Sequence, residues 1–214
     1  GRTVEESEPW WPEPSLPPAG TPNVVMILMD DTGIAHLNCF GGPIDTPNFD
    51  RLANSGLRFA NFHTTALCSP SRACLLTGRN HHAVGMRAIS NFDTGFPNMR
   101  GRIAPEAATI AEMLGPKGWS TFCVGKWHLA PIMEASTAGP FHNWPLQKGF
   151  DRFYGFMQGE TDHFHPDLCA DNHPIEQPAR PEDGYKLREA LVAQAISIVG
   201  NQHSLVREKP ILLY

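Results

Sequence analysis

The sequence predicts an α/β fold built on a central, mostly parallel β-sheet that is flanked by helices. Short apolar segments of strand length alternate with longer segments whose apolar residues recur at helical spacing. This alternation is typical of parallel sheets whose two faces are covered by helices. The 19 glycines and 20 prolines are spread without a repeat, which favours a loop-rich domain over a fibrous or low-complexity chain.

Residues 1–20 are expected to form an N-terminal arm, and residues 21–214 to form the folded part. Glutamate and proline are concentrated in the arm, and such a composition resists regular structure. We therefore expect the arm to extend loosely, as chain termini commonly do. Trp10 and Trp11 offer the alternative that the arm is pinned to the body of the protein.

Four segments are predicted to be strands. The run Val24–Met29 is continuously apolar and β-branched at its start, so we expect a strand buried on both faces. Residues 57–62 alternate between polar and apolar, which predicts a half-buried strand. Residues 120–124 and 210–214 are apolar and are predicted to be buried strands. The segment 130–183 is rich in proline, glycine and histidine and is expected to form loops over the sheet.

Four segments are predicted to be helices from their apolar spacing and their end signals. A hydroxyl residue can cap the first turn, proline fits that turn, and glycine tolerates the conformation that ends a helix. The expected helices are 46–56 (capped by Thr46, with Pro47, ended by Gly56), 69–78 (capped by Ser69, with Pro70, ended by Gly78), 110–118 (ended by Gly118) and 187–199.

Composition excludes several classes of protein. With 17 basic against 22 acidic residues, the net charge of −5 argues against a nucleic-acid-binding protein. No apolar run approaches the roughly 20 residues that span a bilayer, so we expect no membrane association. Five scattered cysteines without a C-x-x-C pair predict neither a zinc ribbon nor a disulfide scaffold. They favour the cytoplasm, although removal of a signal peptide would instead indicate the periplasm or secretion.

Polar residues follow three of the predicted strands. Since the carboxyl ends of parallel strands share one edge of a sheet, where ligands bind in α/β folds, we expect these residues to converge. Paired carboxylates suit Ca²⁺ or Mg²⁺, while Arg, Lys, His and a helix N-terminus suit a sulfate or phosphate group. The residues are Asp30 and Asp31, Cys68 and Arg72, and Lys126 and His128.

Cys68 is the candidate nucleophile of this predicted site. It lies just before a predicted helix with Arg72 one turn further on, and both features make a thiol more reactive. A general cysteine hydrolase with His128 as its base is one interpretation. The alternatives are that the acid pair only caps a loop and that the cysteine is a small buried hydrophobe. We expect burial for the other four cysteines, Cys39, Cys74, Cys123 and Cys169.

Two further groups of polar residues are expected to have lesser roles. We expect His81 and His82 to be surface or packing residues, the alternative being the rim of the site. Asp162, His163, His165 and Asp167 could form a second metal cluster, but their spacing fits no standard ligand pattern. A loop that faces the substrate is the preferred interpretation.

Residues 68–79, Cys-Ser-Pro-Ser-Arg-Ala-Cys-Leu-Leu-Thr-Gly-Arg, resemble the type I sulfatase signature, C-x-P-S-R followed by L-T-G-R. Four more segments resemble elements of that family in the same order, and the resemblance covers roughly residues 22–214. Residues 159–161 and 171–173 are most similar to bacterial-type arylsulfatases. The four segments are 22–31, 46–53, 125–129 and 149–155.

The resemblance implies the fold of the alkaline phosphatase superfamily and hydrolysis of sulfate esters, with aryl sulfates as the expected substrates. In that chemistry a maturation enzyme oxidises Cys68 to formylglycine, whose hydrate attacks the sulfur atom. The alcohol or phenol leaves, and sulfate is expelled as the aldehyde re-forms. Related enzymes of the superfamily hydrolyse phosphonate monoesters or phosphodiesters, and this activity is an alternative. A truncated relative that only binds its ligand is another.

Individual roles also follow from the resemblance. Asp30, Asp31 and the modified Cys68 would bind Ca²⁺, with Mg²⁺ possible. Arg72 would hold the hydrated aldehyde and the sulfate, Lys126 would contact sulfate, and His128 would position the nucleophile. The resemblance also implies that residues 21–214 are the N-terminal part of the sulfatase catalytic domain, and the family's remaining metal ligands and its leaving-group acid are expected after Tyr214. We therefore expect residues 1–214 alone neither to bind the ion tightly nor to turn over substrate.

Overall fold

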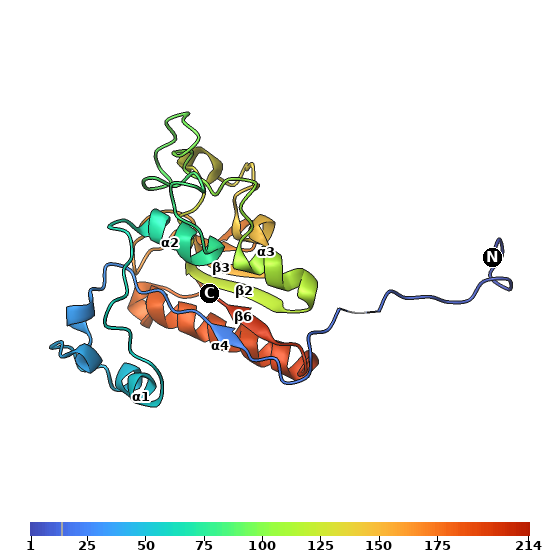
Figure 1. Cartoon of the computed structure of the whole chain (residues 1–214), viewed down its shortest axis with the longest axis horizontal. Coiled ribbons are helices and arrows are strands. Elements are labelled where there is room, and N and C mark those ends of the chain that lie inside the picture. Colours follow the sequence, from blue (N-terminus) through green and yellow to red (C-terminus); the bar gives the residue numbers. More distant parts are fainter. Residues whose placement is uncertain (14) are drawn as a thin grey trace.

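A computed structural model describes residues 1–13 and 15–214. A six-stranded sheet forms the middle layer of the molecule, with helices on both of its faces (Figure 1). The strand order in the sheet is β1-β6-β2-β3-β4-β5. The predicted α/β class is confirmed. The strands are β1 (Val24–Val25), β2 (Ser120–Lys126), β3 (Arg152–Phe156), β4 (Leu168–Ala170), β5 (His173–Ile175) and β6 (Ile211–Leu213).

The first four strands in this order run parallel to one another, from β1 through β6 and β2 to β3. The pairs β3–β4 and β4–β5 are antiparallel. β6 is the last strand in the sequence, yet it lies between β1 and β2. Its position brings Tyr214 beside β2, where the backbone N–H of Tyr214 donates to the carbonyl of Phe122, and Figure 1 shows the C-terminus within the sheet. The carboxyl ends of β1, β6 and β2 therefore share one edge.

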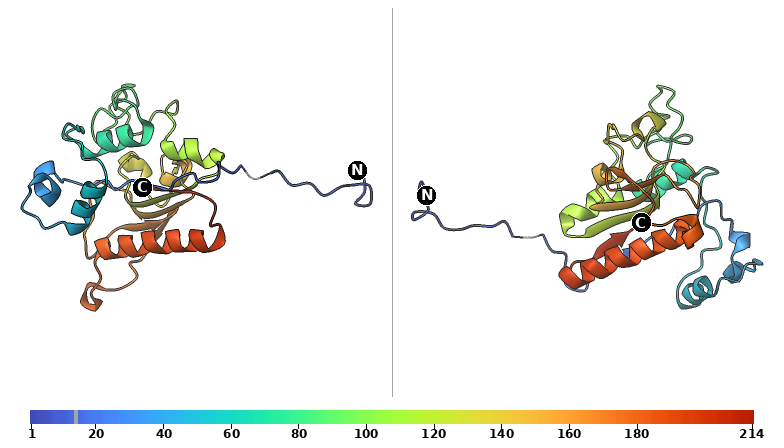
Figure 2. Two further views of the ribbon diagram at one scale, coloured as in Figure 1. Left: turned by 60° about the horizontal axis from the view of Figure 1, so that its bottom comes forward. Right: turned by 180° about the vertical axis from the view of Figure 1, so that it is seen from behind.

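The helices form the outer layers. α2 and α3 cover one face of the sheet and α4 covers the other (Figures 1 and 2). α1 lies beside the sheet, near the first two short 3₁₀ helices (Figure 1). The α-helices are α1 (Pro47–Ser55), α2 (Cys68–Thr77), α3 (Ile110–Leu114) and α4 (Leu187–Leu205). The 3₁₀ helices are Ile34–His36, Asn38–Phe40, Gly115–Lys117, Ile132–Glu134, Pro145–Lys148 and Pro181–Asp183.

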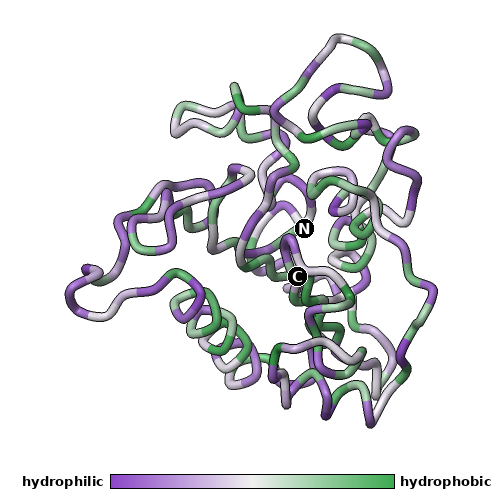
Figure 3. The backbone as a smooth tube through the Cα atoms, turned by 90° about the vertical axis from the view of Figure 1, so that its left-hand side faces the viewer, coloured by the Kyte–Doolittle hydropathy of each residue, from purple (hydrophilic) through white to green (hydrophobic). Residues whose placement is uncertain are grey.

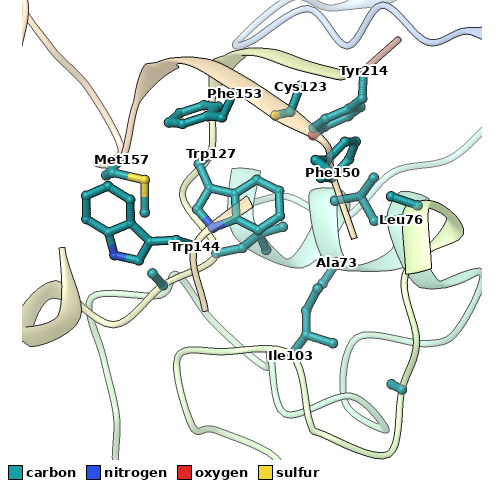
Figure 4. Close-up of a cluster of buried hydrophobic side chains, with 14 of the residues drawn as sticks. Ala73, Leu76, Ile103, Cys123, Trp127, Trp144, Phe150, Phe153, Met157 and Tyr214 are labelled. Atoms are coloured by element: carbon teal, nitrogen blue, oxygen red, sulfur yellow. The ribbon is translucent and has the colours of Figure 1, made fainter. Parts of the chain in front are cut away.

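Alternate side chains of the sheet enter the two layers of core. Phe153 of β3 belongs to the larger cluster, which also contains Ala73 and Leu76 of α2 (Figure 4) and Ala111 of α3. Its neighbour Tyr154 packs on the other face with Leu187 of α4. This is the two-residue period of a strand covered on both faces. At the centre, Trp127 meets Phe150 edge to face, and its indole N–H donates to the carbonyl of Asn143 at 2.7 Å.

The prediction that Val24–Met29 is buried on both faces is wrong. Val25 is 57% exposed and Ile27 is 69% exposed, whereas Val24, Met26 and Leu28 pack against the core. β1 is an edge strand of the sheet, and the exposure of Val25 and Ile27 shows that one of its two faces is largely open. Other large hydrophobic residues outside the core are also exposed, among them Leu52 and Ile196, and Figure 3 shows how hydrophobic and hydrophilic residues alternate along the backbone.

Two other strand predictions also fail. Residues 57–62 form no strand. Leu57 and Phe59 are 85% and 65% exposed, and a two-residue period makes a strand only where a neighbour pairs with it. Segment 130–183 is not all loop, because it contains β3, β4 and β5. β3 was missed because its sequence, Arg-Phe-Tyr-Gly-Phe, is aromatic with an internal glycine and lacks polar–apolar alternation.

The predicted helices are confirmed with changes at their ends. α2 begins at Cys68, one residue earlier than expected, and Leu67 is its N-cap. Ser69 is therefore not a cap, and its hydroxyl instead accepts the backbone N–H of Ser90 at 3.1 Å. α4 continues beyond residue 199 to Leu205. Thr46 occupies the N-cap of α1, but its hydroxyl accepts from the Asn38 backbone rather than from the helix.

The N-terminal residues project away from the body of the molecule (Figures 1 and 2). Trp10 and Trp11 are both exposed. Among the described residues, none of the helices combines the length and the apolar character needed to cross a membrane.

Candidate functional site

The residues predicted to converge lie at the carboxyl edge of the parallel strands. Asp30 follows β1, Lys126 ends β2, and Arg72 lies in the first turn and a half of α2. The Lys126 ammonium donates to Oδ2 of Asp30 at 2.6 Å. Nη2 of Arg72 is 3.6 Å from Oδ1 of the same carboxylate. Three separate segments of the chain thus meet at one charged cluster.

Cys68 and His128 form the second contact of the site. Sγ of Cys68 is 3.1 Å from Nδ1 of His128. Cys68 is partly exposed at the start of α2, whereas His128 is only 3% exposed. The backbone of His128 has a φ of 52°, a left-handed conformation uncommon outside glycine. Its N–H still donates to the carbonyl of Met157 at 3.1 Å, so the segment after β3 fixes this turn.

The electrostatics of the site keep His128 uncharged. Burial and, to a smaller extent, the nearby charges of Lys126 and Arg72 together lower the pKa of His128 to about 4, against a smaller opposing effect of Asp30. An uncharged imidazole has one nitrogen that donates and one that accepts a hydrogen bond. Nε2 lies 2.7 Å from Oδ1 of Asn91. No sequence motif singles out Asn91, which lies in an irregular loop.

The guanidinium of Arg72 donates hydrogen bonds to two oxygen atoms of the protein. It is almost fully buried, and its Nη1 donates to the carbonyl of Lys126 at 2.8 Å and to the hydroxyl of Tyr214 at 3.1 Å. Burial raises the pKa of Tyr214 to about 12, so this hydroxyl stays protonated. Nε of Arg72 is buried without a hydrogen-bond partner among the described residues. A fixed guanidinium with an unused donor suits an anionic ligand.

The second predicted carboxylate, Asp31, is exposed and joins none of these contacts within the described chain. In the part of the chain that the structure describes, no group of three or more His, Cys, Asp or Glu side chains is placed to hold a metal ion. Ca²⁺ usually takes six to eight oxygen ligands. Asp30 and Asp31 fit only a part of such a shell, so we derive no catalytic step through a metal.

The lesser candidates lie apart from these contacts. Nδ1 of His81 donates a hydrogen bond to the carbonyl of Met86 at 3.0 Å, and His82 is exposed. Asp162 accepts the backbone N–H groups of Phe164 and His165. This carboxylate therefore shapes its own loop, and a second metal cluster is not formed by the described residues of that loop.

The Sulfatase family model matches residues 22–214. Arylsulfatase A of Homo sapiens is 39% identical over 168 residues, which are 78% of this chain and 30% of that protein. Arylsulfatase of Klebsiella aerogenes is 34% identical over 145 residues, or 67% of this chain and 30% of that protein. The chain thus spans about 30% of the length of these two curated relatives.

Solved structures show the same relationship. Ps i-CgsB superposes with a TM-score of 0.74 at 27% identity, covering 90% of this chain and 44% of that one. BT4656, solved in complex with its substrate D-glucosamine-2-N,6-O-disulfate, has a TM-score of 0.65 at 29% identity. That match covers 90% of this chain and 33% of BT4656.

Proposed function

Since the chain belongs to the sulfatase family, we propose that the whole protein hydrolyses sulfate esters, aryl sulfates among them, through a formylglycine made from Cys68. The observation that carries this proposal is the 3.1 Å approach of Cys68 Sγ to the uncharged His128. Beside this pair lie the cations of Arg72 and Lys126. A nucleophile precursor, a base and two anion-binding groups therefore occupy one small site.

The surroundings of residue 68 fit a hydrated aldehyde. The group would supply one hydroxyl to attack sulfur and a second whose deprotonation lets sulfate leave. Nδ1 of His128 is positioned to take that proton.

Arg72 and Lys126 have the electrostatic role in this proposal. Negative charge on the sulfate oxygens is stabilised by cations that are already fixed in place before the substrate arrives. Arg72 is fixed by two hydrogen bonds. The Lys126 ammonium has three donors, so its ion pair with Asp30 leaves two for sulfate oxygens.

We further propose that Asp30, Asp31 and residue 68 contribute ligands to a Ca²⁺ ion, with Mg²⁺ as the alternative. Carboxylate oxygens are the donors that both ions prefer. Calorimetric titration of the whole protein with each ion tests this. The Asp30→Asn and Asp31→Asn variants should each bind the ion more weakly, whereas Asp162→Asn, which alters an exposed carboxylate of another loop, should bind as wild type. Equal affinity in all four proteins would refute the assignment.

We also propose that a formylglycine-generating or equivalent enzyme acts on Cys68. Mass spectrometry of the peptide that contains residue 68, taken from active protein, tests this directly. We expect the aldehyde, and an unmodified thiol would instead favour a cysteine hydrolase. Cys68→Ala should abolish turnover, whereas Cys74→Ala, a partly exposed cysteine on the same helix, should retain it.

Parallel turnover of an aryl sulfate, a phosphonate monoester and a phosphodiester tests the substrate class. Sulfate and phosphate groups are both tetrahedral oxyanions that the same cations can bind. We expect the sulfate ester to be hydrolysed fastest. Faster phosphonate turnover would replace the proposed activity by that of a phosphonate hydrolase.

A further inference from the structure

We propose that Asn91 is a positioning residue that fixes the tautomer of His128, with the proton on Nε2 and the lone pair of Nδ1 directed at residue 68. The catalytic meaning of this tautomer rests on the proposed function. Its structural basis does not, because it follows from contacts within the chain.

The two ring nitrogens of His128 have different neighbours. Nε2 lies 2.7 Å from Oδ1 of Asn91, and Nδ1 lies 3.1 Å from Sγ of Cys68. An amide oxygen accepts hydrogen bonds and has no proton to donate. The Nε2 proton must therefore come from the imidazole, and an uncharged imidazole has only this one. Nδ1 is left as an acceptor that faces the nucleophile position.

Asn91 is tied to the helix that carries Cys68. The backbone N–H of Ser90 donates to Oγ of Ser69 at 3.1 Å, and both serines are almost completely buried. Ser69 directly follows Cys68 in the sequence and Ser90 directly precedes Asn91, so each serine adjoins one of the two residues whose side chains contact the His128 ring. This buried hydrogen bond therefore fixes Asn91 and Cys68 relative to each other on opposite sides of the imidazole.

Gly159 packs closely against the imidazole ring of His128 and limits its movement. A Cβ added at Gly159 would lie 2.6 Å from Cε1 and 2.9 Å from Nε2 of His128, closer than side chains approach each other. The φ of Gly159 is not in the left-handed region. This glycine is therefore required for space rather than for backbone conformation. An imidazole packed against it has little freedom to turn and exchange its two nitrogens.

The tautomer decides what His128 can do in the proposed reaction. With a lone pair at Nδ1, the ring can take a proton from a hydroxyl on residue 68. With a proton there, the ring could only donate to that oxygen. Loss of the Asn91 carbonyl should therefore slow turnover more than it weakens substrate binding, since neither Arg72 nor Lys126 is altered.

NMR of the whole protein labelled with ¹⁵N-histidine tests the tautomer without requiring activity. Two-bond ¹H–¹⁵N correlations distinguish the two nitrogens, and His128→Gln identifies the signal of His128. We expect the Nε2–H form in the wild type and in Asn91→Asp, whose carboxylate also accepts. Asn91→Leu should shift the ring towards the Nδ1–H form. Asn98→Leu, a change at an exposed asparagine of the same loop, should leave it unchanged.

The kinetic arm separates this inference from the proposed function. If the whole protein is a sulfatase, Asn91→Leu should lower kcat at least about tenfold, part of the 10²–10⁴-fold that a positioned base contributes. KM should change little, and Asn91→Asp should recover most of the rate. If the tautomer shifts as expected but the wild type turns over no sulfate ester, the proposed function fails and the role of Asn91 stands.

Two results would overturn the inference. One is an Nδ1–H form of His128 in the wild type, and the other is an unchanged tautomer in Asn91→Leu. Gly159→Ala provides a second variant if Asn91→Leu does not fold. Its added methyl group should displace the ring and change both ¹⁵N shifts of His128, and unchanged shifts would equally contradict the proposed confinement.

Discussion

Arg72 donates a hydrogen bond to the hydroxyl of Tyr214, which lies 142 residues further along the chain, at 3.1 Å. The bond joins the first part of α2 to the residue after β6, the strand that lies between β1 and β2. This hydrogen bond helps to fix the buried guanidinium of Arg72, whose Nη2 lies 3.6 Å from Oδ1 of Asp30. The stability of the fold and the shape of the anion site therefore depend on the same phenol.

Tyr214→Phe should destabilise the protein by about 1–3 kcal/mol, because a buried charged donor loses its acceptor. Urea unfolding monitored by circular dichroism measures this loss. Tyr185→Phe is the matched control, since the buried hydroxyl of Tyr185 has no hydrogen-bond partner among the described residues. Removing it should be neutral or slightly stabilising. An equal loss in both variants would show that the bond to Arg72 contributes nothing.

Acidification should destabilise the protein through His128. Burial and the neighbouring cations hold its pKa near 4 in the folded state, against an ordinary value of 6.5. Between these two pH values the unfolded chain binds more protons than the folded one, so stability falls as the pH drops from about 6.5 to about 4. Above this window His128 has no effect.

Urea midpoints measured at a series of pH values test this effect. His128→Gln should show a shallower loss in the acid window, whereas His82→Gln, a change at an exposed histidine, should follow the wild type. If His128→Gln and the wild type lose stability in parallel, His128 is not the titrating group.

Gly155→Ala should prevent stable folding. Gly155 of β3 pairs with Gly125 of β2, and a Cβ at this position would overlap the carbonyl oxygen of Gly125. Backbone cannot move away cheaply inside a sheet, so we expect a loss of about 3 kcal/mol or more. Gly115→Ala serves as the control, because only the carbonyl of Gly149, at 3.9 Å, is near its added Cβ.

The control at Gly115 has a helical backbone conformation. Alanine there should be neutral or stabilise by up to about 1 kcal/mol. Thermal melts of the two variants and the wild type test this prediction. A melting temperature of Gly155→Ala equal to that of the wild type would contradict it.

Thiol titration should separate the cysteines by burial. All five are free in the described part of the chain, and Cys123 and Cys169 are buried. Burial raises the pKa of Cys169 to about 11 and also raises that of Cys123. Because the thiolate is the reactive form, an aromatic disulfide reagent should label Cys39 and Cys74 quickly and these two slowly.

The same reagent counts the cysteines after denaturation. Of the five cysteines, four should react if residue 68 has become an aldehyde and all five if it has not. In native protein, the Cys123→Ser variant should lack part of the slowly reacting thiol that the wild type shows. If the slow phase of the variant is as large as that of the wild type, Cys123 is not a buried thiol.

The convergence of Asp30 and Lys126 was predictable because each lies after or at the end of a strand in a parallel sheet. Arg72 was placed with them through a strand at residues 57–62 that does not form, although its position near the start of α2 does bring it to the same edge. Cys68 and His128 were identified by the same reasoning. The supporting contacts were not predictable. Asn91 lies in an irregular loop, and Tyr214 was assigned only to a strand, so nothing local indicates what either side chain touches.

The strand errors have a related cause. Residues 57–62 have the alternation of a strand, but a strand exists only if another strand pairs with it, which is a property of the whole fold. Conversely, β3 was missed although it pairs with β2 over five residues. The pairing of Gly125 with Gly155 requires two backbones to approach closely. The pattern of hydrophobic residues in the sequence does not reveal such an approach.

The central position of β6 has a consequence for the order of assembly. Among the described residues, β6 is the one strand that pairs with β1, and the side chain of Asn23 accepts the backbone N–H of Ile211 across 188 residues of sequence. The first strand thus has no partner until residues 211–213 are available. Contacts between such distant parts of a chain form slowly, so β1 and its apolar neighbours should stay exposed during synthesis and need protection from aggregation.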